Sequence, residues 1–218
     1  REEEINAFVP EEYWTLDAQL HVHGSRKKLT AHYYGDKDGR KAIHSKEEVE
    51  ALMKRLEGCE YEVRDVKLGE RVKKAPIPFT TSTLQQEASK TLNFSTQKTM
   101  RLAQQLYEGV DIKGRGTIGL ITYLRTDSTR IAAEADAAAR SYIGDQFGAS
   151  YVSEAPAAAK SDAKIQDAHE AIRPTDITLT PVQVKEQLSR DQFRLYQLIW
   201  KRFTASRMRP AVYETTSV

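Results

Sequence analysis

The chain has 218 residues, 39% of them hydrophobic and 29% charged, and a formal net charge of +2. This length corresponds to one large domain or two small ones, and the composition excludes a globally disordered or collagen-like chain. No apolar run approaches the roughly 20 residues that span a bilayer, and the acidic start REEEINAF lacks the pattern of a signal peptide. A single cysteine, Cys59, excludes an internal disulfide and a cysteine-based zinc cluster. We therefore expect a cytoplasmic protein without a membrane segment.

The positive charge is concentrated in two stretches. Residues 24–46 and 181–210 each carry an excess of five positive charges. Such stretches are typical of proteins that bind a polyanion, and they are equally typical of solvated faces balanced by acidic segments elsewhere. Arg1 opens a highly charged segment without a helix cap, and the end AVYETTSV stops within a β-like pattern. We therefore expect the chain to be a piece of a larger protein.

The first third of the chain predicts a small sheet with one helix. Residues 14–22 alternate apolar and polar side chains, as in a half-buried antiparallel strand. Residues 29–34 predict its hairpin partner, followed by the turn sequence GDKDG. A helix is expected between Ser45 and Gly58, and residues 61–72 return to β character.

The segment APIPFTTST, with two prolines in three residues, predicts a boundary after which helices dominate. The first helix is expected around residues 83–87, with Glu87 completing a capping box with the hydroxyl cluster. The second places Leu106 and Tyr107 on one apolar stripe. This second helix is expected over residues 96–108. Further helices are expected from 128 or 129 to 147, from 180, and from 191 to 203, and a last strand is expected over 212–218. The stretch 153–171, rich in Ala, Ser and Lys, predicts a loop.

This order of elements predicts an α+β protein, an antiparallel β domain with an inserted all-α helical domain. The β domain comprises residues 11–79 and 210–218, and its last strand is expected to return to the first sheet. The helical domain comprises residues 80–209. Residues 1–10 are expected to be the end of a helix from a preceding domain.

The sequence KGRGTIGLITYLRTDSTR is the first candidate for chemistry. An apolar, strand-like run ends abruptly in polar residues, and a following helix N-terminus would attract an anion there. If this run is extended, Tyr123 and Arg125 share a face, about 6–7 Å apart along the backbone, and one phosphate could contact both. The alternative is that Tyr123 packs on an apolar edge while Arg125 pairs with Asp127.

The second candidate is DAHEAIRP, in which His169 and Arg173 would face together on a helical turn. A lone histidine is more often a hydrogen-bonded structural residue than a catalyst. The sequence contains no HExxH zinc motif, no Walker A loop and no serine nucleophile elbow. Residues 114–119, GRGTIG, have the GxGxxG spacing, but they follow a predicted helix rather than a strand, so they do not read as a dinucleotide-binding fingerprint. These absences argue against a metalloprotease, a nucleotide-binding protein or a serine hydrolase.

Four segments in this order resemble the type IA DNA topoisomerases, bacterial topoisomerase I in particular. The resemblance covers essentially the whole chain, and its tyrosine motif is highly specific. The segments are PFTTSTLQQEASKTLNFSTQKTMRLAQQLYEG, GLITYLRTDSTRI, AHEAIRPTD and LYQLIWKRFTASRMRPAVY.

This resemblance implies that Tyr123 is the nucleophile, with the motif arginine at Arg125 and the motif histidine at His169. The β domain would be part of the family's arch, and the helical domain would carry the tyrosine and move as the gate opens. The family's toprim domain, whose acidic residues bind magnesium, is not in this chain. Mg²⁺ is therefore expected in the complete enzyme and no metal in this fragment, which we expect to be inactive alone.

The implied reaction relaxes negatively supercoiled DNA by transient cleavage of one strand through a 5′-phosphotyrosine, without ATP, because the exchange of phosphodiesters is nearly isoenergetic. A phenol is largely protonated at neutral pH, and an adjacent guanidinium favours the phenolate and meets the charge of the transition state. Arg125, Arg173 and Ser128 are expected to contact DNA, and His169 to position the phosphate. Asp127 and Glu170 are expected to orient the arginines or the motif backbone.

The expected partner is DNA in the bacterial cytoplasm, associated with the nucleoid, with neither a membrane nor a nucleotide involved. The rival hypothesis is a non-catalytic module that binds single-stranded DNA or another protein, with Tyr123 in its core. Tyrosine recombinases are disfavoured, because their scattered Arg and His set around a C-terminal tyrosine is missing.

Overall fold

The computed structural model describes residues 1–36, 38–153 and 169–218. These residues form two compact units, one of residues 1–66 with Val218 and one of residues 67–217. Most of the predicted loop 153–171 lies outside the described residues. Among the residues described, no helix is long and apolar enough to cross a membrane.

The first unit contains two short hairpins and two helices. The predicted hairpin is confirmed, because β1 pairs antiparallel with β2 in a register that sets Leu20 opposite Leu29. The predicted helix is also confirmed, and the Ser45 side chain accepts a hydrogen bond from the Glu48 N–H at its start. The elements are α1 (Glu2–Asn6), β1 (Asp17–His21), β2 (Lys28–His32), β3 (Gly35–Asp36), β4 (Gly39–Arg40) and α2 (Lys46–Leu56).

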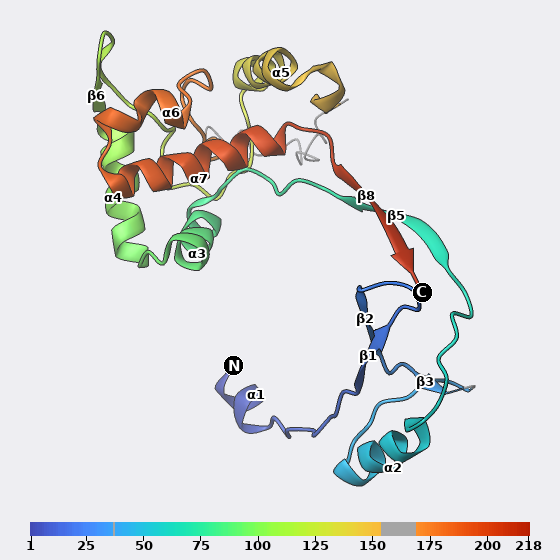
Figure 1. Cartoon of the computed structure of the whole chain (residues 1–218). Helices are drawn as coiled ribbons and strands as arrows, with labels where there is room; N and C mark the ends of the chain where they lie inside the picture. Colours follow the sequence, from blue (N-terminus) through green and yellow to red (C-terminus); the bar gives the residue numbers. More distant parts are fainter. Residues whose placement is uncertain (37, 154–168) are drawn as a thin grey trace. The chain divides into compact units, whose positions relative to one another are not determined.

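The second unit is a helical cluster with short antiparallel strands. Figure 1 shows α7, the longest helix, running alongside α6 and across α3 and α4. Serine and threonine side chains cap three of these helices, as their sequences favour. The elements are β5 (Lys67–Lys73), α3 (Thr81–Leu92), α4 (Thr96–Glu108), β6 (Val110–Ile112), β7 (Gly116–Ile118), α5 (Ala133–Phe147), the 3₁₀ turn η1 (Ala149–Tyr151), α6 (Pro181–Val184), the 3₁₀ turn η2 (Lys185–Gln187), α7 (Arg190–Ser206) and β8 (Ala211–Ser217).

The core of the second unit lies where α3, α4 and α7 meet the chain segments around residues 120 and 172. Tyr196 of α7 is fully buried, and its hydroxyl donates to the Leu179 carbonyl at 2.7 Å. Each large apolar side chain buried here contributes about 1.5–3 kcal/mol. The largest fully buried apolar side chains of this cluster are Phe79, Leu84, Leu106, Leu120, Ile121, Leu124, Ile172, Leu195 and Ile199.

The strands do not form the single sheet that the sequence predicted. The described strands make four separate two-stranded sheets. The last strand does return to the predicted β segment, because β8 pairs antiparallel with β5, which overlaps the predicted strand 61–72. The predicted strand 61–72 is real only from Lys67 onward. At α3, Thr80 and Thr83 form the capping box, and Glu87 takes no part in it. Whether 11–79 with 210–218 forms an arch domain around 80–209 stays a prediction.

Candidate active site

Tyr123 lies on an irregular segment between β7 and α5, which bends at Leu124 and Arg125. Its side chain is 44% exposed, whereas Leu124 beside it is buried against the core. Exposure continues to alternate along the segment, with Arg125 exposed and Thr126 buried. Tyr123 and Arg125 therefore share the outward face, and the phenol can be reached from solvent.

Thr81, the first residue of α3, holds this segment from the inside. Its hydroxyl donates to the carbonyls of Leu124 (2.7 Å) and Thr126 (3.1 Å). The Thr126 N–H donates back to the same hydroxyl at 2.8 Å, and the Thr81 N–H donates to the Thr126 carbonyl at 2.9 Å. One threonine thus fixes the backbone on both sides of Arg125.

The residues before Tyr123 pair with the segment that follows His169. The Thr122 N–H donates to the Arg173 carbonyl at 2.9 Å, and the Thr122 hydroxyl donates to the Ala171 carbonyl at 2.8 Å. Ile121 also forms an antiparallel bridge with Pro174. The two sequence motifs, separated by about 50 residues, therefore meet at the tyrosine.

Two aromatic rings contact the Tyr123 ring. The His169 imidazole is stacked on it, with ring centroids 6.3 Å apart and an interplanar angle of 28°. The Tyr107 ring meets it in a T-shaped arrangement with centroids 5.5 Å apart and an angle of 66°. All three rings line one pocket of about 350 Å³, with Thr122, Glu170 and Arg173.

Tyr107 is a site residue that sequence reasoning missed. The periodicity of its helix placed it on the apolar stripe, yet its side chain is 39% exposed, at the last turn of α4. The available signal was its position just before Gly109, where the helix ends and its side chain no longer faces a core. The spacing of residues along the sequence gave no indication that the Tyr123 ring would contact the Tyr107 ring.

Arg173 and Glu170 form an ion pair inside the pocket wall. Glu170 accepts from Arg173 Nε at 2.8 Å and from Nη2 at 2.7 Å, and Arg173 Nη1 donates to the Pro174 carbonyl at 3.0 Å. Their side chains are only 12% and 20% exposed. Most donors of the Arg173 guanidinium are therefore engaged by Glu170 and the Pro174 carbonyl, although Arg173 still lines the pocket.

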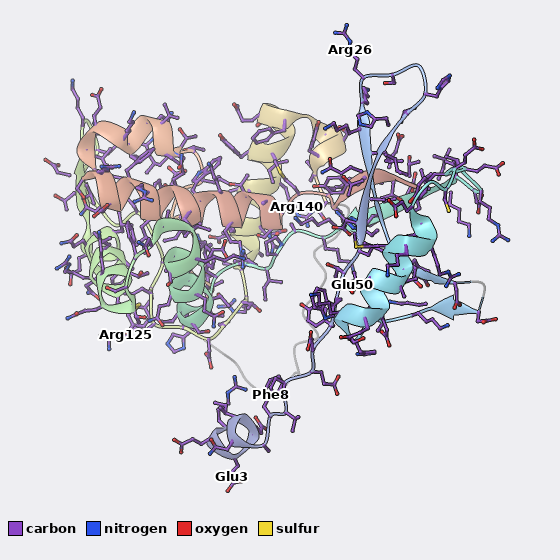
Figure 2. The ribbon with its side chains drawn as sticks, turned by 60° about the horizontal axis from the view of Figure 1, so that its bottom comes forward. Glu3, Phe8, Arg26, Glu50, Arg125 and Arg140 are labelled. Carbon is purple, nitrogen blue, oxygen red and sulfur yellow. The ribbon has the colours of Figure 1, made fainter. Side chains whose placement is uncertain are left out.

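The other predicted site residues are not gathered with these. Arg125 is exposed (Figure 2), and no hydrogen bond or ion pair joins it to Asp127 or to another described residue. Ser128 is buried, and its hydroxyl accepts from the Arg130 N–H at 3.2 Å. A DNA contact through Ser128 stays a prediction, which its burial disfavours.

Two local predictions are wrong. No helix starts at Ser128 or Thr129: α5 begins at Ala133, so no helix N-terminus follows the tyrosine directly. The hydroxyl of Thr126 accepts from the Ser128 N–H, and the Arg130 carbonyl accepts from Ala171, so backbone groups that a helix would use have other partners.

Residues 169–175 are likewise extended rather than a helical turn. Ile172 forms a bridge with Phe79 on one side, while Pro174 forms one with Ile121 on the other. These backbone pairings outweigh the local preference for a turn. His169 and Arg173 nevertheless line the same pocket, because residues four apart also lie on the same side of an extended chain.

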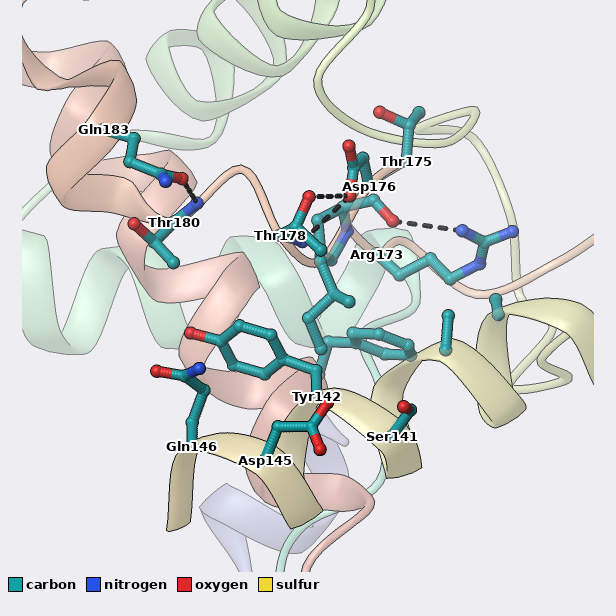
Figure 3. Close-up of a pocket in the computed structure, with 15 residues that line it drawn as sticks. Ser141, Tyr142, Asp145, Gln146, Arg173, Thr175, Asp176, Thr178, Thr180 and Gln183 are labelled. Carbon is teal, nitrogen blue, oxygen red and sulfur yellow. Dashed lines mark hydrogen bonds between the residues drawn. The ribbon is translucent and has the colours of Figure 1, made fainter.

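A second cavity of about 640 Å³ lies between α5 and the segment from Arg173 to Thr180 (Figure 3). Asp176 on its wall accepts hydrogen bonds from Thr178 and Arg115. Burial alone raises the pKa of the Asp176 carboxyl, but these hydrogen bonds outweigh burial and hold the pKa below its ordinary value. Arg173 lines both cavities, whereas Glu170 lines only the one at Tyr123.

The described residues include no group of three or more His, Cys, Asp or Glu side chains that could hold a metal ion. Of the two carboxylates singled out in the sequence motifs, Glu170 is engaged by Arg173.

Comparison with known proteins places this geometry in a family. The family model described as DNA topoisomerase (Topoisom_bac) matches residues 1–218. A solved structure of full-length topoisomerase I from Thermotoga maritima, in a monoclinic crystal form, is 41% identical with a TM-score of 0.74. The match covers 99% of this chain and 32% of that chain, so this chain spans about a third of it. These findings confirm the resemblance that the motifs indicated.

Proposed function

The chain belongs to the DNA topoisomerase family, and on this premise we propose that it is the tyrosine-bearing part of a bacterial type IA enzyme that relaxes negatively supercoiled DNA. The Tyr123 oxygen attacks a backbone phosphorus of a single-stranded segment. The phosphorus–oxygen bond to the neighbouring sugar breaks, a 5′-phosphotyrosine forms, and the sugar oxygen leaves as a hydroxyl. After strand passage that hydroxyl attacks the phosphotyrosine, the bond from phosphorus to the Tyr123 oxygen breaks, and the phosphodiester and the phenol are restored. One phosphoester bond replaces another in each step, so no ATP is consumed.

The exposure of the Tyr123 phenol, at a pocket it shares with His169, is the observation that carries this proposal. The binding-module hypothesis required Tyr123 to lie in the core, where no strand could reach it. Arg125 on the same face is available to meet the extra negative charge of the pentavalent phosphate with two donors of its fork. His169, stacked on the nucleophile, positions the scissile phosphate by hydrogen bonding.

Arg173 and Glu170 form the pocket wall next to the bound phosphate. Arg173 contacts DNA through guanidinium N–H groups that do not bind Glu170. Asp127 orients the motif arginine or the motif backbone, and Ser128 stays a predicted contact to DNA. Magnesium, bound by the toprim domain in this family, would neutralise charge at the phosphate. We assign it to no residue of this chain, and we expect this chain alone to be inactive.

The test is covalent adduct formation by a complete topoisomerase that contains this chain. The wild-type protein, mixed with a labelled single-stranded oligonucleotide, is expected to yield a protein–DNA adduct whose peptide contains Tyr123. Tyr123→Phe should abolish adducts and supercoil relaxation, whereas Tyr151→Phe, at another exposed tyrosine of the same unit, should leave both intact.

A Tyr123→Phe protein that still relaxes supercoils would end this assignment. If the wild-type protein binds the oligonucleotide tightly and forms no adduct at all, the non-catalytic binding module is the better description.

A further inference from the structure

We propose that Tyr107 is a positioning residue for the nucleophile: its ring holds the Tyr123 ring in the orientation from which the phenol oxygen attacks. The inference rests on the proposed function of Tyr123. It begins from the T-shaped contact between the two rings, whose centroids are 5.5 Å apart, on the wall of a shared pocket. Tyr107 does not contact the reacting atoms in this assignment, so its effect passes through Tyr123.

An exposed tyrosine needs such a restraint. Rotation about its side-chain torsions moves the phenol oxygen by several ångströms, and a displacement of about 1 Å can cost as much as 10²-fold in rate. Thr81 and Thr122 fix the backbone on either side of Tyr123, but their hydrogen bonds do not restrict its side chain. Ring contacts with Tyr107 and His169 supply that restriction.

Tyr107 is suited to this task because the backbone around it is hydrogen-bonded to, and closely packed against, the segment that leads to Tyr123. The Leu120 N–H donates to the Leu106 carbonyl at 2.7 Å. At Gly119 the chain passes so close to α4 that an added Cβ would lie 2.5 Å from the Tyr107 carbonyl oxygen. The last turn of α4 and the residues leading to Tyr123 therefore move as one piece.

The contact is made by the ring and not by the hydroxyl of Tyr107, which forms no hydrogen bond to a described residue. This distinction gives the experiment its conservative variant. A T-shaped aromatic pair is worth a factor of roughly 2 to 13 in an equilibrium or rate when it is lost.

The experiment measures single-turnover adduct formation by the complete topoisomerase over a range of oligonucleotide concentrations. Tyr107→Leu is expected to lower the rate at saturating oligonucleotide by roughly 2- to 13-fold and to leave the half-saturating concentration unchanged. Tyr107→Phe, which keeps the ring, should restore most of the rate. Tyr151→Leu, which removes an exposed ring elsewhere in the same unit, is the matched control.

Three results would overturn the inference. A Tyr107→Leu rate equal to that of the wild type would show that no restraint is needed. A raised half-saturating concentration with an unchanged saturating rate would show that Tyr107 contacts DNA instead. A Tyr107→Phe variant as slow as Tyr107→Leu would assign the effect to the hydroxyl.

Circular dichroism and the thermal midpoint check that Tyr107→Leu folds. If it does not, Tyr107→Met, an unbranched replacement, takes its place with the same expected values. Failure of this inference is distinct from failure of the proposed function, because adducts on Tyr123 in the wild-type protein are unaffected by the outcome at residue 107.

Discussion

Arg125 is the residue whose proposed role in the reaction separates most cleanly from any role in folding. Its side chain is exposed and has no hydrogen-bond or ion-pair partner among the described residues. Its removal therefore costs the fold little, whereas loss of a charged donor at a developing phosphate charge costs on the order of 10²-fold or more. Arg173, by contrast, is engaged by Glu170, so its replacement would leave a half-buried carboxylate unpaired.

We expect Arg125→Ala to slow adduct formation by at least about 10²-fold with an unchanged thermal midpoint. Arg125→Lys should be intermediate, since an ammonium keeps the charge and loses the two-pronged geometry. Single-turnover cleavage and calorimetry measure the two quantities. Arg101→Ala, at another exposed arginine of the same unit without a described partner, is the control. Equal cleavage by the two alanine variants would remove Arg125 from the mechanism.

At the scale of elements, the site depends on the first residue of α3. The Thr81 hydroxyl bonds to backbone groups on both sides of Arg125. We expect Thr81→Val to lower the free energy of unfolding by about 1–3 kcal/mol and also to slow cleavage, because the segment that carries Arg125 is released. Thr99→Val deletes a buried hydroxyl that bonds only within its own helix, so it should lower stability without slowing cleavage at equal fraction folded. Urea unfolding measures the free energy of unfolding, and cleavage kinetics measure the rate of cleavage. If Thr81→Val loses stability but cleaves as fast as Thr99→Val at equal fraction folded, Thr81 does not position the segment that carries Arg125.

Local pattern predicted those elements whose partners are near in sequence. Alternation gave β1 and β2, and a capping serine with helical spacing gave α2, because each is decided within about 15 residues. The predicted start of α5 was wrong because the Thr126 and Ser128 hydroxyls accept hydrogen bonds from backbone N–H groups nearby. The Arg130 carbonyl also accepts a hydrogen bond from Ala171, some 40 residues away. The motifs named four residues that line the candidate pocket: Tyr123, His169, Glu170 and Arg173. The contact between Tyr107 and Tyr123 was not predictable, since it depends on how closely α4 approaches Gly119.

At the scale of the whole molecule, the chain is two units, and the predicted machinery lies in one of them. The residues of both motifs belong to the unit 67–217. That unit carries its own core, formed largely by α3, α4 and α7. We therefore expect the stability of this unit and the proposed chemistry at Tyr123 to be coupled, so that conditions that destabilise the unit also disturb the site.

Acid is such a condition, and Asp136 is where we expect it to act. Asp136 on α5 accepts from Arg140 Nε at 2.6 Å and from Arg207 Nη1 at 2.8 Å, so it ties α5 to the chain just beyond α7. Burial alone raises the pKa of the Asp136 carboxyl, but the hydrogen bonds from the two arginines outweigh burial and hold the pKa below its ordinary value of 3.8. A depressed pKa in the folded state stabilises the fold above the unfolded-state pKa, and this stabilisation is lost as the pH falls through the folded-state value.

We therefore expect Asp136→Asn to lower the free energy of unfolding by about 2 kcal/mol at pH 7, and the difference from the wild type to shrink as the pH falls below about 4. Urea titrations at several pH values test this, with Trp200 fluorescence reporting on the unit 67–217 after Trp14→Phe has silenced the other tryptophan. Asp145→Asn, on the same helix and without an ion pair among the described residues, is the control variant. A difference at Asp136 that stays constant from pH 7 to pH 3 would mean that packing, and not the charge shared by the two arginines, holds α5 in place.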